Sequence, residues 1–179
     1  MLKLIKFFIK SLTHKKTSYS YGGVDLLILD IFKNQKKGYY LDIGCAHPIK
    51  NNNTYLLYKK GWNGVNIDLD KENIDLFNSH RKRDFNVTAA VSDKEGEADL
   101  YFYHNKSALN TISKQNADFQ KAEISSIKKI KTQSINKILE NSPYKDRKID
   151  FLSVDVEGSE LDIFKDFDFK TLFGVVRFD

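Results

Sequence analysis

Two short stretches decide the fold: Tyr39-Tyr40-Leu41-Asp42-Ile43-Gly44 and Gly64-Val65-Asn66-Ile67-Asp68. Each is a mostly apolar run with an acid at or near its end. Such runs are typical of strands buried on both faces, as the strands of a parallel sheet are. A helical segment separates the two runs. Together they predict a strand, a helix and a second parallel strand joined by a right-handed crossover.

The rest of the chain continues this alternation. Apolar spacing predicts further helices over 24–32, 55–59, 70–77, 134–139 and 159–164, and further strands over 85–91, 98–103, 149–156 and 174–178. Residues 105–131 are polar and rich in lysine, and we interpret them as a surface excursion that lies over a substrate pocket. The pattern predicts an α/β fold with a doubly wound, mostly parallel sheet.

Composition limits the classes of protein that fit. The 179 residues suit one domain, and 30% charged with 41% hydrophobic residues argues against disorder. The net charge of +5 comes largely from lysine, so it is only a weak indication of nucleic-acid binding. The single Cys45 excludes an internal disulfide and a cysteine-based metal cluster, which favours the reducing cytoplasm.

The N-terminal segment, residues 1–16, predicts a basic amphipathic helix. Apolar residues recur at helical spacing on one face and lysines occupy another: Ile5, Phe8, Ile9, Leu12, Lys3, Lys6, Lys10. The apolar run is too short to span a bilayer. Two hypotheses stay open: residues 1–12 contact an anionic membrane surface, or the helix packs on its own domain or on a partner chain. Residues 17–179 then form the main domain.

Three acids follow predicted strands. In a doubly wound fold Asp42, Asp68 and Asp155 lie at the carboxyl edge of the sheet, where ligands bind. Asp68 follows Asp42 at close to the ~20-residue spacing of an acid that accepts hydrogen bonds from ribose hydroxyls. Any one of these acids could instead be a helix cap or a surface charge. The basic run 81–83 is most simply a solvated loop.

The turn after the first strand favours an adenosyl ligand without phosphates. Gly44-Cys45-Ala46-His47-Pro48 has one glycine, and its proline lacks an N–H. A pyrophosphate needs a glycine-rich turn that lets the backbone approach closely. Without phosphates, Asp42 would face an ammonium group. The turn therefore favours S-adenosylmethionine over a nicotinamide dinucleotide.

Three motifs, in this order, resemble the FkbM-type S-adenosylmethionine-dependent methyltransferases. They are residues 40–48, residues 53–68 with Asn53-Thr54-Tyr55 and Gly61-Trp62-Asn63-Gly64, and residues 149–161 with Asp155-Val156-Glu157-Gly158. The resemblance extends from about residue 21 to the end of the chain. It implies a class I, Rossmann-like methyltransferase domain over residues 17–179.

The resemblance also implies a set of cofactor-binding residues. It places Asp42 and Gly44 near the methionine part of S-adenosylmethionine and Asp68 on the ribose. Ala90, Val91 and Ser92 would border the adenine. Asn53 and Asp155 complete the set.

Asp155 and Glu157 follow the strand that usually faces the transferred methyl group in such folds. They would orient the acceptor, act as a base or help to hold a metal, and the metal requirement stays unknown. Equally, Glu157 could cap the following helix while Asp155 only binds the cofactor. His47 is either a base for a hydroxyl, given its near-neutral pKa, or a residue that packs the loop.

On this analogy the function is O-methylation of a hydroxyl on a sugar, a glycan or a related metabolite. The alternatives are a catalytically inactive cofactor-binding or scaffold protein and a nucleic-acid-binding module. The last lacks clustered arginines with interleaved aromatics, so we expect no nucleic-acid partner.

The sequence also departs from the family's pattern. Val24 stands where related sequences tend to carry an acid. The sheet of the family normally continues beyond the strand predicted at 174–178, so we expect either a C-terminally truncated domain or an oligomer that covers an open sheet edge.

Overall fold

The structure is a computed structural model that describes residues 17–93, 95–103, 109–120, 123–165, 167 and 169–178. The helix predicted over residues 1–16 lies outside the described residues, so both hypotheses about it stay predictions. In the part of the chain that is described, no helix has the length and apolar character needed to cross a membrane.

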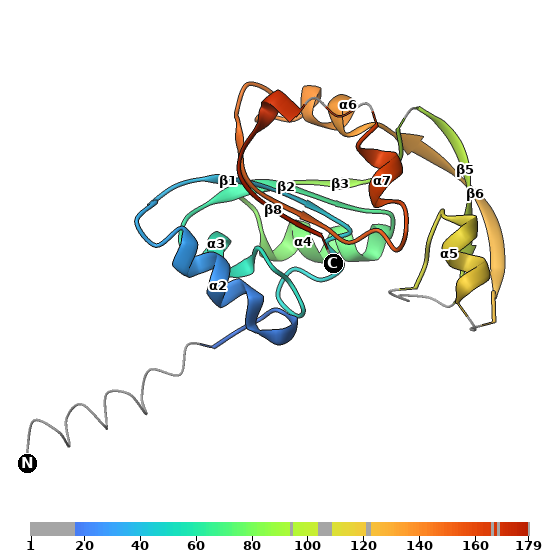
Figure 1. Cartoon of the computed structure of the whole chain (residues 1–179), viewed down its shortest axis with the longest axis horizontal. Helices are drawn as coiled ribbons and strands as arrows, with labels where there is room; N and C mark the ends of the chain where they lie inside the picture. Colours follow the sequence, from blue (N-terminus) through green and yellow to red (C-terminus); the bar gives the residue numbers. More distant parts are fainter. Residues whose placement is uncertain are drawn as a thin grey trace, which may run out of the picture.

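A five-stranded parallel sheet forms the centre of the domain (Figure 1). Its strands, in spatial order, are β3 (Phe85–Thr88), β2 (Asn63–Asp68), β1 (Tyr39–Ile43), β7 (Ile149–Val154) and β8 (Leu172–Phe178). The predicted mostly parallel α/β sheet is confirmed. β2 and β3 follow β1 on one side of it, and the chain later adds β7 and β8 on the other side of β1. This reversal between β1 and β7 opens a crevice at the carboxyl ends of the strands.

Helices cover both faces of this sheet (Figure 1). On one face lie α2 (Val24–Ile31), α3 (Tyr55–Lys59) and α4 (Lys71–His80), and on the other lie α6 (Ile135–Glu140) and α7 (Glu160–Ile163). Two single turns of 3-10 helix, Tyr21–Gly23 and Phe169–Thr171, complete these layers.

Alternation along β1 divides the core between the two faces. Leu41 and Ile43 pack with Ile135 and Ile163 on the α6 and α7 side. Tyr40 packs with Ile28, Leu57 and Trp62 on the α2 and α3 side.

A smaller sheet of order β4-β6-β5 extends from one end of the domain. It comprises β4 (Ala90–Val91), β5 (Gly96–Phe102) and β6 (Ser126–Gln133), with α5 (Lys114–Phe119) nearby. The strand predicted over 85–91 is wrong as one element, because the chain leaves the main sheet at Ala89 and joins the second one. The excursion predicted over 105–131 contains α5 and most of β6. The apolar pattern does not reveal this strand, because half of its side chains are exposed, three of them lysines, and its pairing is made by the backbone.

The predicted helix starts at Asp70 and Ser134 are confirmed by their hydrogen bonds. The Asp70 carboxylate accepts from the Glu72 amide, and the Ser134 hydroxyl accepts from the Lys137 amide. The strand predicted over 149–156 ends earlier, at Val154. Beyond Val154 the chain turns, and Glu157 and Gly158 have positive φ values of 53° and 93°, outside the β region of backbone dihedral angles. The domain limits, the truncation and an oligomer at a sheet edge stay predictions.

Candidate active site

A cavity of about 490 Å³ lies at the carboxyl ends of β1, β2 and β7. β1 ends at Ile43, β7 ends at Val154, and Ile67 is the last residue but one of β2. Ile43 and Ile67 line the cavity. Further apolar lining comes from Leu69 and from the 89–91 segment that joins the two sheets. The volume is within the range of pockets for small molecules and cofactors.

Gly44 stands where β1, β2 and β7 meet. Its φ is 75°, and a Cβ added to it would lie 1.7 Å from the carbonyl oxygen of Asp155. The Gly44 amide donates to the Ile67 carbonyl at 2.9 Å, and the Asp155 amide donates to the Ile43 carbonyl at 2.9 Å. The three strand ends are therefore tied together at a point that only glycine fits.

Asp68, the last residue of β2, joins the two loops on one side of the cavity. Its Oδ2 accepts from the Ala46 amide at 2.8 Å, and its Oδ1 accepts from the Asp70 amide at 2.8 Å and from Asn73 Nδ2 at 3.3 Å. Burial raises the pKa of the Asp68 carboxyl, and these donors oppose the rise. A carboxylate has about four lone-pair sites, so Asp68 keeps capacity for a ligand hydroxyl.

His47 lines the cavity from the loop after β1. Its Nδ1 accepts from the amides of Ile49 and Lys50, at 3.1 and 3.0 Å, which assigns the proton of the neutral ring to Nε2. Burial, followed by the nearby Lys50 charge, lowers the pKa of His47, so the neutral form dominates at pH 7. The neutral ring therefore offers an N–H donor at Nε2.

Glu157 lies on the β7 side of the cavity and adopts a left-handed φ of 53°. Its carbonyl accepts from Thr111 Oγ1 at 2.7 Å and from Asn116 Nδ2, while Asn116 Nδ2 also lies 3.5 Å from its Oε2. Burial raises the pKa of Glu157; Asn116 lowers it and the Glu160 charge raises it. At this turn Glu160 Oε1 accepts from the Val156 and Gly158 amides, and the alternative that Glu157 caps α7 stays a prediction.

The charged side chains that line the cavity are acidic. Asp68, Asp70, Asp155 and Glu157 line it, and no lysine or arginine among the described residues does. Such a lining disfavours phosphate groups and favours a cationic or neutral ligand. Within the described parts of the chain, no group of three or more histidine, cysteine or acidic side chains is arranged to hold a metal ion.

Comparison with known families gives the class of protein. Residues 42–177 match the family model of the methyltransferase FkbM domain, and the match covers most of the chain. The chain belongs to the FkbM methyltransferase family. The matched residues include the end of β1, all of β2 and β7 and every residue that lines the cavity, so family and fold agree on a methyltransferase with a Rossmann-like α/β sheet. No curated protein and no solved structure matched the chain.

Seven of the predicted site residues line the cavity of this FkbM domain: Gly44, His47, Asp68, Ala90, Val91, Asp155 and Glu157. Among them Ala90 and Val91 are buried in the apolar wall, whereas Asp155 is exposed. Their roles toward a ligand stay predictions.

The other three, Asp42, Asn53 and Ser92, are not among the lining residues. Asn53 Nδ2 donates to Ser153 Oγ at 3.2 Å, and the Ser92 amide donates to the Gln133 carbonyl at 3.1 Å. Asp42 pairs in register with Asn66, two residues below the level of Asp68. At that depth its carboxylate accepts from Thr54 Oγ1 and Asn52 Nδ2, at 2.8 and 3.1 Å, and is covered by them.

The prediction that the 105–131 excursion lies over a pocket is confirmed at Asn110 and Ile112, which line the cavity. No periodicity in this weakly patterned segment singles out these two residues. Arg81 does not line the cavity, but the prediction of a solvated loop over 81–83 is wrong for it, because Arg81 is wholly buried. A signal was present: Ile74 and Phe77 lie on the buried face of α4, and Arg81, which follows the helix as its C-cap, continues their helical spacing in the sequence.

Proposed function

We propose that the protein is an S-adenosylmethionine-dependent methyltransferase that methylates a hydroxyl group of a sugar, a glycan or a related metabolite. The observation that carries this is the acidic cavity at the crossover between β1 and β7 of an FkbM domain. Its carboxylates suit a sulfonium ligand and repel a pyrophosphate.

The described residues fit the parts of S-adenosylmethionine. Asp68 would accept hydrogen bonds from the ribose hydroxyls, and Ala89, Ala90 and Val91 offer an apolar wall to the adenine. Gly44 lets the backbone approach closely where the methionine part would lie. When bound, the cofactor supplies an electrophilic methyl group.

The acceptor would lie against Asp155, Glu157 and Ile112. Glu157 is half-buried and its pKa is raised, so its carboxylate is a stronger base than an ordinary glutamate. It would take the proton of the acceptor hydroxyl, while Asp155 orients the acceptor. With its proton on Nε2, neutral His47 would donate a hydrogen bond to a ligand. Positioning supplies much of the rate enhancement in such a transfer.

Isothermal titration calorimetry tests the cofactor. We expect S-adenosylmethionine to bind and NAD, which carries a pyrophosphate, to bind at least 10-fold more weakly. A folded sample that binds NAD as tightly, or that does not bind S-adenosylmethionine, would refute the proposal.

Mass spectrometry of a panel of glycans and free sugars then tests the reaction. We expect one or more acceptors to gain a methyl group in the presence of the protein and S-adenosylmethionine. Cofactor binding without any methylated acceptor would favour the inactive binding or scaffold protein. We further propose the cytoplasm as the compartment, supported by the single, buried Cys45, and no nucleic acid as a partner.

A further inference from the structure

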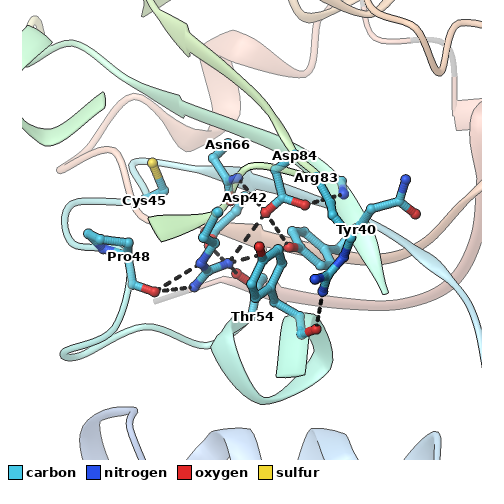
Figure 2. Close-up of polar contacts among 12 residues, drawn as sticks. Tyr40, Asp42, Cys45, Pro48, Thr54, Asn66, Arg83 and Asp84 are labelled. Carbon is cyan, nitrogen blue, oxygen red and sulfur yellow. Dashed lines mark hydrogen bonds and ion pairs between the residues drawn. The ribbon is translucent and has the colours of Figure 1, made fainter. Parts of the chain in front are cut away.

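Arg81 is wholly buried beneath the loop that follows β1. Its Nε and Nη2 both donate to the Pro48 carbonyl, at 2.9 and 2.7 Å. Its Nη1 donates to Thr54 Oγ1 at 2.7 Å, and its Nη2 donates to Asn52 Oδ1. Figure 2 shows the hydrogen bonds that the Pro48 carbonyl accepts. One guanidinium thus contacts three residues of the 44–54 segment.

Two buried carboxylates balance the charge of Arg81. Asp84 Oδ2 lies 3.9 Å from Arg81 Nη1, and Asp84 also accepts from Tyr40 Oη and Asn66 Nδ2. Asp42 shares Thr54 and Asn52 with Arg81. A buried arginine is costly unless it is paired and hydrogen-bonded. The two carboxylates therefore stabilise the buried guanidinium, whose planar set of N–H groups donates to the loop.

The loop needs such support because its backbone is strained. Ala46 has a φ of 49°, in the left-handed region that disfavours alanine, and Asn51 has a φ of 48°, which asparagine tolerates better. Ala46 is held by its hydrogen bond to Asp68, on the cavity side. The other end of the loop is held by Arg81 through Pro48 and Asn52. Between these two anchors lies His47, which lines the cavity.

We propose that Arg81 is a positioning residue, which holds the 44–54 loop in the shape that forms one wall of the cavity. It acts on the ligand through Ala46 and His47 and does not itself line the cavity. The identity of the ligand rests on the proposed function; the hold on the loop does not.

Hydrogen exchange tests the hold on the loop without any ligand. Arg81→Lys keeps the charge and loses the planar fork that reaches Pro48, Asn52 and Thr54 together. Relative to the wild type, we expect the Ile49, Lys50 and Asn52 amides to exchange at least about 10-fold faster, with the β1 amides unchanged. Arg83→Lys is the matched control, because Arg83 is exposed and donates to the Tyr58 carbonyl of α3. It should leave the loop amides unchanged.

Thr54→Val provides a second, milder variant that keeps Arg81 and removes one of its acceptors. It should accelerate the same three amides to a smaller extent. Loop exchange at the wild-type rate in folded Arg81→Lys, or in Thr54→Val where Arg81→Lys does not fold, would overturn the proposal.

Calorimetry with S-adenosylmethionine then separates positioning from simple folding. A loosened loop raises Kd, by at least about 10-fold in Arg81→Lys, at unchanged binding stoichiometry. A merely structural role lowers the stoichiometry and leaves the Kd of the folded fraction unchanged, which would overturn the proposal. If the wild type does not bind S-adenosylmethionine and the loop amides still accelerate, the proposed function fails and the role of Arg81 in holding the loop stands.

Discussion

Asp42 and Asp68 lie near and at the ends of two neighbouring strands, yet their environments differ. Asp68 is level with Gly44 at the edge of the sheet, lines the cavity and is held by backbone amides. Asp42 lies two residues deeper, among side chains that also contact the buried Arg81. An acid near the end of a strand therefore lines the cavity only if the strand register places it at the carboxyl edge of the sheet.

Burial raises the pKa of both carboxyls, but different groups oppose the rise. For Asp42 the charge of Arg81 opposes it most, followed by Thr54 and Asn52. For Asp68 the backbone amides of Asp70 and Ala46 oppose it most. We therefore expect loss of Asp42 to act mainly on stability, and loss of Asp68 mainly on binding.

The largest effect is expected at Gly44, on the edge that Asp68 shares. Gly44→Ala would place a Cβ 1.7 Å from the Asp155 carbonyl oxygen, so β1 and β7 must separate there. We expect the free energy of unfolding, measured in urea, to fall by about 4 kcal/mol or more. Gly61→Ala is the control: Gly61 also has a positive φ, of 99°, but no atom outside Gly61 and its two chain neighbours lies within 4 Å of an added Cβ. It should cost about 1 kcal/mol. Equal losses in the two variants would contradict the close approach.

Asp42→Ala should show that this acid belongs to the buried network. It leaves Arg81 with one carboxylate and removes an acceptor that Thr54 Oγ1 and Asn52 Nδ2 share, so we expect a loss of about 3 kcal/mol in the free energy of unfolding. The Asp30→Ala control removes an exposed acid paired with Lys33 and should be nearly neutral. An Asp42→Ala protein of wild-type stability that no longer binds S-adenosylmethionine would instead place Asp42 in the site.

Asp68→Asn should weaken S-adenosylmethionine binding about 10- to 100-fold, since hydrogen bonds to a charged group are worth about 1.5–3 kcal/mol. Asp75→Asn, on the exposed side of α4, is the control and should bind as the wild type does.

The pH dependence of this binding has a defined sign. The acceptor is the ionised carboxylate, which is lost as pH falls through the pKa of Asp68. Because that pKa is raised, wild-type affinity should begin to fall at a higher pH than for an ordinary aspartate. Asp68→Asn should lack this step. A wild-type affinity that stays constant across it would contradict the ribose role of Asp68.

The smallest effect is expected across the cavity, at Asn116. Its donation to the Glu157 carboxylate lowers the pKa of that acid, so Asn116→Ala should raise it. As a base Glu157 works when ionised, and the acidic limb of the pH–rate profile should move to higher pH. Gln115→Ala, on the exposed face of the same helix, should leave the profile unchanged. An unmoved limb in Asn116→Ala would argue against Glu157 as the base.

Much of the main sheet followed from the sequence, because its apolar runs and helix caps are local signals. The runs ending at Ile43 and Asp68 and the cap at Asp70 were located to within a residue. The lysine-rich β6 was missed, because its exposed side chains give no apolar pattern.

The site was predictable in part. Asp68 ends β2, and Gly44 and Glu157 follow β1 and β7, so the topology places all three at the cavity. The depth of Asp42 depends on strand register, and the burial of Arg81 depends on tertiary packing. Neither strand register nor tertiary packing can be predicted from the local sequence.

The most direct test is an NMR titration of the ¹⁵N-labelled protein with S-adenosylmethionine. We expect the largest chemical-shift changes at the amides of Ala46, Leu69 and Ala90, around Asp68, and small changes at Gly64 and Asn66, near the Asp84 end of the buried network. A folded sample whose Ala46, Leu69 and Ala90 amides do not respond at saturating ligand would contradict a cofactor site on the Asp68 side of the sheet.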